Sequence, residues 1–114
     1  MEQLNKVELR GTVGSIRTSN VGGRMMAYFT IATNIIFKGK DGSVIIETTW
    51  TNCSAFESET TKDLERIEKG TKVSLIGRLR NQRYTCSDGT DRTQTDVLVK
   101  ELHVIDDEIL TYQE

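Results

Sequence analysis

The chain contains no proline, one histidine and two cysteines in 114 residues. Without proline there is no Pro-rich linker, and the length fits one domain. Cys53 and Cys86 are far apart and form no Cys-x-x-Cys pair, and His103 is the single histidine, so the side chains that hold zinc are too few. We therefore expect two free thiols in a reducing compartment, no metal site and no cofactor.

Long apolar runs are missing as well. No stretch approaches the roughly 20 apolar residues of a membrane helix, and the opening MEQLNKVELRG lacks the apolar segment of a secretory signal. We expect a cytoplasmic protein with no membrane contact. Catalytic patterns are also absent: His103 has no triad-like context, there is no P-loop, and Asp88 and Asp91 fit ordinary turn chemistry. The sequence favours a binding protein over an enzyme.

The net charge of −2 is unevenly distributed. Residues 1–100 hold all 15 Lys and Arg against 12 Asp and Glu, which gives +3, whereas residues 101–114 hold five acids and no Lys or Arg. A folded body and an exposed tail act separately on partners. We therefore predict a mildly basic domain at 1–105 and a short acidic tail at 106–114.

A period of two dominates the chain and predicts five strands, near residues 6–13, 25–33, 43–56, 72–84 and 92–104. Gly22-Gly23, Asp41-Gly42 and Asp88-Gly89 are typical of the turns between them.

The period changes once, at 60–70, which predicts a short helix with Leu64 and Ile67 on one face. Thr60 with Asp63 resembles a capping box, and Gly70 is the expected stop. An all-β chain of five strands with one short helix between the third and fourth has the element order of a five-stranded OB-fold barrel. Other small β-rich folds remain alternatives at this point.

Only 6% of the residues are aromatic, so the position of each ring is informative. In TTWTNCSAF, Thr51, Cys53 and Ala55 share one face of a strand, and Trp50 and Phe56 share the polar one. A bulge or a partner subunit would bury these rings in an ordinary structural role. Large apolar surface left exposed usually marks a binding site.

The stretch GRLRNQRY repeats this pattern with Arg78, Arg80, Gln82 and Tyr84 on one face and Leu79 on the other, beside Leu75 and Val73. Phe37 adds a ring next to Lys38 and Lys40. Unpaired bases stack on aromatic faces while Lys and Arg neutralise the phosphates, and each stack contributes about 1–3 kcal/mol. A duplex hides its base faces, so this pattern favours single-stranded nucleic acid.

These residues also match a known family. NKVELRGTVG, MMAYFTIATN, TTWTNCSAF and EKGTKVSLIGRLRNQRYTCSDGTDR, with the spacing between them, resemble bacterial single-stranded DNA-binding proteins of the homotetrameric OB-fold type, from about Asn5 to about Val99. Each block alone is a weak signal, but together they are specific.

The resemblance implies sequence-independent binding of single-stranded DNA in replication, recombination and repair, by a nucleoid-associated homotetramer. It implies base stacking on Phe37, Trp50, Phe56 and Tyr84. The phosphate-contacting cations that it implies are Lys6, Arg17, Arg80 and Arg83, to which the strand pattern adds Arg78.

The chain departs from the family at three places. Thr51-Asn52 stand where the family often has His-Arg, and Glu57-Ser58 where it often has Gly-Lys, which predicts weaker or more salt-sensitive binding. The tail, DDEILTYQE, is the expected contact for replication and repair proteins but lacks the family's Pro-Phe tip. The alternative function is an OB-fold accessory subunit of the replication machinery that acts mainly through protein contacts.

Overall fold

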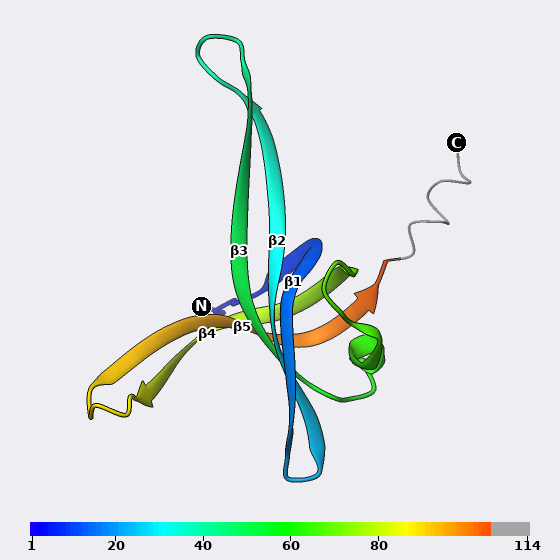
Figure 1. Cartoon of the computed structure of the whole chain (residues 1–114), viewed down its shortest axis with the longest axis vertical. Coiled ribbons are helices and arrows are strands. Elements are labelled where there is room, and N and C mark those ends of the chain that lie inside the picture. The colour runs from blue at the N-terminus through cyan, green and yellow to red at the C-terminus, as the bar shows by residue number, and fades with distance from the viewer. Residues whose placement is uncertain (106–114) are drawn as a thin grey trace.

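The computed structural model describes residues 1–105, so the acidic tail predicted at 106–114 lies outside the described residues. Five strands close into a barrel in the order β1-β2-β3-β5-β4 (Figure 1), which confirms the predicted five-stranded barrel. The strands and the single 3₁₀ helix are β1 (Val7–Val21), β2 (Arg24–Lys38), β3 (Val44–Phe56), η1 (Lys62–Arg66), β4 (Lys72–Thr85) and β5 (Asp91–Val104).

The two Asp-Gly turns form as predicted. Gly42 and Gly89 take φ values of 85° and 87°, which a residue without Cβ adopts readily. Asp41 accepts hydrogen bonds from the backbone N–H and the hydroxyl of Ser43, at 3.0 and 2.6 Å. Asp88 accepts the equivalent pair from Thr90, at 3.0 and 2.6 Å. These bonds lower the pKa of both carboxyls, and they show that Asp88 has a turn role.

The helical segment differs from its prediction at the cap. Thr61, not Thr60, precedes η1, and its side chain makes no capping bond. The Thr60 hydroxyl donates instead to the Lys100 carbonyl at 2.6 Å, and the Asp63 carboxylate accepts from the Val104 N–H at 2.9 Å. Both side chains of the expected capping box therefore attach the segment to β5. Leu64 is buried as predicted.

The core lies on the inner faces of all five strands. Ile31, Leu75 and Leu102 are almost completely buried, and Leu64 and Ile67 cover one end. Gly77 lies where β4 and β5 shift register, and a Cβ there would overlap the Leu98 carbonyl oxygen. The close approach of two backbones explains this glycine.

The hairpins between β1 and β2, β2 and β3, and β4 and β5 extend beyond the barrel wall (Figure 1), and the last two carry predicted site residues. β2 pairs with β3 over its whole length, from Met26↔Phe56 to Lys38↔Val44, but β1 accompanies β2 only as far as Ala32. The segments 33–38 and 44–49 therefore form a two-stranded ribbon, called the β2–β3 arm below. β4 and β5 form another projecting hairpin. Leu79 lies on the core-facing side of β4 as predicted. It is 48% exposed, because β4 pairs with β1 only as far as Gly77 and has left the barrel at this point.

Candidate nucleic-acid interface

The four predicted rings lie outside the core. Trp50, Tyr84 and Phe37 are 61%, 47% and 44% exposed. Phe56 is half-buried at the end of β3. None of them is part of the hydrophobic core, and Trp50 and Tyr84 project from the barrel as predicted.

The position of Trp50 depends on a glycine two strands away. Trp50 pairs with Ala32 of β2, and its indole reaches across β2 to β1. A Cβ at Gly14 would overlap the outer edge of that indole and crowd the Thr30 hydroxyl. The absence of a side chain at Gly14 thus lets the ring lie against the sheet with most of its surface open to solvent.

Two arginines lie over rings on the same outer surface. The guanidinium carbon of Arg24 is 5.0 Å from the centroid of Phe56, and that of Arg17 is 5.1 Å from the centroid of Tyr28. Arginine over an aromatic face is an attractive arrangement that also places positive charge beside a stacking surface. Arg17 was predicted as a site residue, whereas Arg24 and Tyr28 were not.

The register places Phe37 and Trp50 on opposite faces of the ribbon. Phe37 pairs with Ile45 and Trp50 with Ala32, and successive residues of a strand alternate between faces. The face of Trp50 continues the outer surface of the barrel. Phe37 continues the inner, core-facing surface along the β2–β3 arm, so the two rings do not share one flat platform.

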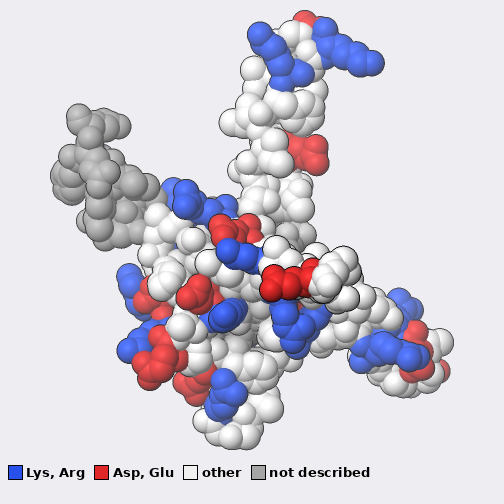
Figure 2. Space-filling view, turned by 180° about the vertical axis from the view of Figure 1, so that it is seen from behind, with Lys and Arg blue, Asp and Glu red and all other residues white. Residues whose placement is uncertain are grey.

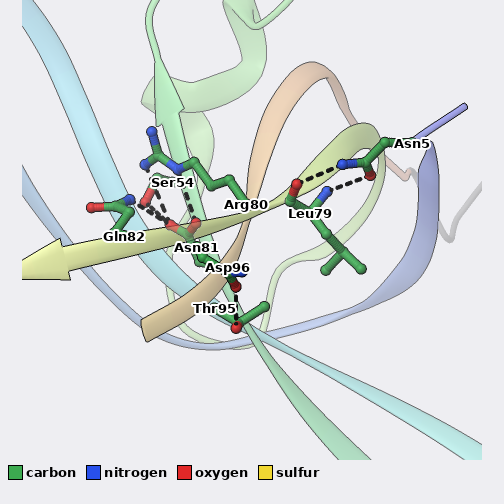
Figure 3. Close-up of polar contacts among 8 residues, drawn as sticks. All are labelled: Asn5, Ser54, Leu79, Arg80, Asn81, Gln82, Thr95 and Asp96. Carbon is green, nitrogen blue, oxygen red and sulfur yellow. Dashed lines mark hydrogen bonds and ion pairs between the residues drawn. The ribbon is translucent and has the colours of Figure 1, made fainter. Parts of the chain in front are cut away.

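Arg80 is held inside a polar network (Figure 3). Its Nε donates to Asp96 Oδ1 at 2.9 Å, and Ser54 Oγ and Gln82 Nε2 donate to Asp96 Oδ2 at 2.7 and 3.2 Å. The Asp96 side chain is 6% exposed and that of Arg80 is 23% exposed. The guanidinium predicted to contact phosphate is therefore already paired with a buried carboxylate.

Burial opposes ionisation of Asp96, but the hydrogen bonds from Arg80 and Ser54 and the charge of Arg80 outweigh it, so the pKa of Asp96 lies below its ordinary value. Beneath this network, burial and then the nearby Asp96 charge raise the pKa of the Cys53 thiol to about 12. Asp96 is thus ionised and Cys53 is neutral at pH 7, and the network is a fixed, fully paired element of the wall.

The remaining predicted cations are dispersed. Arg78 and Lys6 line a separate hollow of about 500 Å³ together with Asn5 and Lys100. Arg78 is exposed and has no ion pair with any residue of 1–105, whereas Lys6 Nζ lies 3.0 Å from Glu8 Oε1. Arg83 lies on the opposite face of the β4–β5 hairpin from Arg80 and is 3.5 Å from Asp91.

Figure 2 shows this mixture of charges on one side of the molecule, with a cationic tip on the otherwise largely uncharged β2–β3 arm. Lys38 and Lys40 lie in this tip. The structure therefore brings Arg17, Trp50, Phe56, Arg80 and Tyr84 to the outer surface. Arg78 is on the same face of β4 as Arg80 and Tyr84 but lies at the separate hollow, and Lys6, Arg83 and Phe37 lie elsewhere.

The partner of Arg80 was missed by sequence reasoning, although a signal for it exists. Arg80 and Asp96 are equidistant from Asp88, and a tight turn centred there pairs residues at equal distances along the two strands. Combining the turn with the strand pattern places the two charges opposite each other. Their burial depends on Ser54 of β3, which no local pattern reveals.

Within the described residues, no group of three or more His, Cys, Asp or Glu is placed to hold a metal ion. No helix in this part of the chain has the length and apolar character needed to cross a membrane.

The sequence profile of the single-strand binding protein family matches residues 4–105, which is nearly the whole described chain. The chain belongs to this family. Among curated relatives, the single-stranded DNA-binding protein of Clostridium perfringens is 34% identical over 106 residues, which cover 90% of this chain and 67% of that protein. The single-stranded DNA-binding protein of Neisseria meningitidis is 28% identical over 106 residues, which cover 90% of this chain and 60% of that protein.

The chain thus spans about 60% of the length of several members of the family that it matches. Solved structures agree on the fold. The Plasmodium falciparum SSB complex with ssDNA superposes with a TM-score of 0.78 at 21% identity, covering 93% of this chain and 98% of that one. The small single-stranded DNA-binding protein of Streptomyces coelicolor superposes with a TM-score of 0.67 at 15% identity, covering 95% and 99%. The β-barrel assigned here is the one found in these proteins.

Proposed function

We propose that this member of the single-strand binding protein family binds single-stranded DNA without sequence dependence and protects it during replication, recombination and repair. The observation that carries the proposal is the exposed indole of Trp50, laid against Gly14 on the outer surface of the barrel. Phe56 and Tyr84 lie on the same surface. Stacking of bases on these rings supplies about 1–3 kcal/mol each.

Phe37 contributes from the β2–β3 arm. Because it lies on the other face of the ribbon from Trp50, a strand of DNA that contacts both rings must pass around the arm. Lys38 and Lys40 at the arm tip would neutralise phosphates along that path. The chain therefore binds DNA by wrapping it over a curved surface.

The cations divide into two roles. Arg17 and Arg24 lie over rings and place charge beside the stacking surface. Arg78 is exposed with no ion pair to a described residue, so it is the best candidate for direct phosphate contact. Lys6 and Arg83 are also candidates, because their ion pairs with Glu8 and Asp91 are exposed to solvent. Arg80 stabilises the outer surface of the barrel through its ion pair with Asp96, which neutralises most of its charge in the absence of DNA.

A homotetramer is proposed as the working assembly, in the cytoplasm and associated with the nucleoid. Replication and repair proteins are its proposed partners through the acidic tail, which lacks the Pro-Phe tip. No catalytic step is proposed.

A second candidate function is supported by the aliphatic surface of the β2–β3 arm. Ile35, Ile36, Val44 and Ile46 are each more than 60% exposed. Exposed apolar surface of this kind commonly contacts other proteins. An accessory subunit of the replication machinery would use this arm to bind a protein partner, and the rings of the barrel would then be unnecessary for its role.

Fluorescence of the single tryptophan separates the two functions. Titration with oligo-dT at low salt should quench Trp50, and added salt should reverse the quenching. Trp50→Ala should weaken binding, measured by anisotropy of a labelled oligonucleotide, by about 1–3 kcal/mol with an unchanged circular dichroism spectrum. Absence of quenching and of binding by the folded wild-type protein would exclude the first function and favour the second.

A further inference from the structure

A cationic hollow lies where β1, β4 and β5 meet, separate from the stacking rings. Its volume is about 500 Å³, and it is lined by Asn5, Lys6, Ile76, Gly77, Arg78, Leu98, Val99 and Lys100. Three of these eight residues are cations, and none is acidic or aromatic. The hollow therefore presents positive charge and offers no ring on which a base could stack.

A β-bulge places Lys100 at this hollow. Ile76 of β4 pairs with Glu101 of β5. The next pair is Gly77 with Val99, which leaves Lys100 as the extra residue without a partner on β4. Bulges of this kind redirect a side chain and are common beside functional sites. The position of Lys100 is therefore a built feature of the β4–β5 junction.

The bulge is held in place by the segment before η1. The Thr60 hydroxyl donates to the Lys100 carbonyl at 2.6 Å, and the Leu102 N–H donates to the Thr60 carbonyl at 3.0 Å. These bonds fix the backbone of Lys100. Its side chain remains exposed and makes no ion pair with any residue of 1–105. The ammonium group of Lys100 is thus oriented by a fixed backbone and is available to an anion.

Asn5 fixes the segment that leads into β1 against the edge of β4 (Figure 3). Its Nδ2 donates to the Leu79 carbonyl at 2.7 Å, and its Oδ1 accepts from the Leu79 N–H at 2.9 Å. In this register the next residue, Lys6, lies beside Arg78. Lys6 pairs with Glu8, but both side chains are exposed, and such pairs are weak. A phosphate can therefore compete for Lys6.

We propose that this hollow binds the sugar–phosphate backbone of bound single-stranded DNA and that Lys100 is one of the residues that contact its phosphates. Arg78 is on the same face of β4 as Arg80 and Tyr84, so a strand stacked on Tyr84 reaches the hollow by following β4 over about 20 Å. Contacts to phosphate carry no sequence information, which agrees with binding that does not depend on sequence. This inference rests on the proposed function.

Replacing Lys100 by glutamine removes the charge and keeps much of the side-chain length. In salt titrations with oligo-dT of about 16 nucleotides, we expect Lys100→Gln to lower the magnitude of the slope by about 0.7. A tenfold rise in salt should then narrow the affinity difference between wild type and variant about fivefold. Oligo-dC should show the same change, because a phosphate contact is independent of the base. Circular dichroism checks that this exposed substitution leaves the fold intact.

Lys69→Gln is the matched control, because Lys69 is also exposed but does not line the hollow. It removes the same charge and should change the slope by much less. Acetylation of the native protein gives a second measurement that needs no variant: bound oligo-dT should protect Lys100 and leave Lys69 reactive.

An unchanged slope for Lys100→Gln, an equal fall for Lys69→Gln, or an unprotected Lys100 would overturn the site while leaving single-strand binding intact. Thermal stabilisation by inorganic phosphate that Lys100→Gln abolishes, without a change in the DNA slope, would overturn it in favour of a free anion. Absence of wild-type binding to oligo-dT would overturn the proposed function instead, so the failures are distinguishable.

Discussion

Replacing Asp96 by asparagine removes one charge from the polar network in the outer wall and keeps the shape of the side chain. Arg80 then loses the carboxylate that Nε contacts at 2.9 Å, and Ser54 and Gln82 lose an ionised acceptor. We expect a loss of folding stability well above that of a typical surface substitution.

The magnitude follows from burial. Breaking a fully buried ion pair by removing one partner costs about 3–5 kcal/mol, because the other charge is left unpaired away from water. The Arg80 side chain is 23% exposed, so water recovers part of this cost, and the asparagine still accepts one or two hydrogen bonds. We therefore expect Asp96→Asn to lower the free energy of unfolding by about 2–3 kcal/mol.

Asp91→Asn is the matched control. Asp91 pairs with Arg83 on the same hairpin at 3.5 Å, but these side chains are 60% and 78% exposed. An exposed pair of this kind contributes less than about 1 kcal/mol. Urea unfolding at one fixed chain concentration, followed by circular dichroism, gives both values, and the fixed concentration removes any contribution from assembly.

A cycle with Arg80→Ala completes the test. Because Arg80 and Asp96 act as one unit, the double variant should be less destabilised than the sum of the single variants, by about 1–3 kcal/mol. Equal losses for Asp96→Asn and Asp91→Asn, or strict additivity in the cycle, would refute the conclusion that the network is a buried, coupled element.

Four further outcomes are expected. In salt titrations of oligo-dT binding, Arg78→Ala should lower the magnitude of the slope by about 0.7, and Arg80→Ala should change it by much less; equal changes would contradict the two roles. Because the pKa of Asp96 is lowered by folding, its stabilisation is complete above the ordinary carboxyl pKa of about 3.9 and is lost as pH falls further, so acid unfolding curves of wild type and Asp96→Asn should converge at low pH. At pH 8 the native protein should react rapidly with a thiol reagent at Cys86 alone, since Cys53 is buried with a pKa of about 12, and a second fast thiol would argue against this burial. Gly14→Ala should shift the emission of Trp50 and weaken DNA binding with little loss of stability, because the added Cβ meets the Trp50 ring, which can move. Gly77→Ala should destabilise the fold, because its added Cβ meets the backbone carbonyl of Leu98.

The parts of the fold that depend on local periodicity were predictable. Strand alternation placed Cys53 and Ala55 on the face opposite Trp50, and the structure buries the first two and exposes the ring. The Asp-Gly pairs marked two of the hairpin turns. These features depend on neighbouring residues of one strand or one turn, so a single sequence contains the information.

Features that depend on a second, distant element were not predictable. Thr60 and Asp63 have the spacing of a capping box, yet β5 captures both side chains. Arg80 has the pattern of an exposed cation, yet Ser54 and Asp96 enclose it. Leu79 follows the apolar alternation of β4, yet the strand has left the barrel at that point. For Thr60, Asp63 and Arg80 a long-range contact overrides a correct local pattern, and for Leu79 the expected long-range contact is missing.

The barrel is closed unevenly around its circumference. β3 and β5 meet in parallel through only two residue pairs, Cys53↔Val97 and Ser54↔Leu98, whereas β1 and β4 share six. With two pairs against the six between β1 and β4, this seam has fewer backbone partners, so we expect it to open before the β1–β4 junction. Single-stranded DNA bound across β3 and β5 would hold this junction closed, so bound DNA should raise the thermal stability of the barrel.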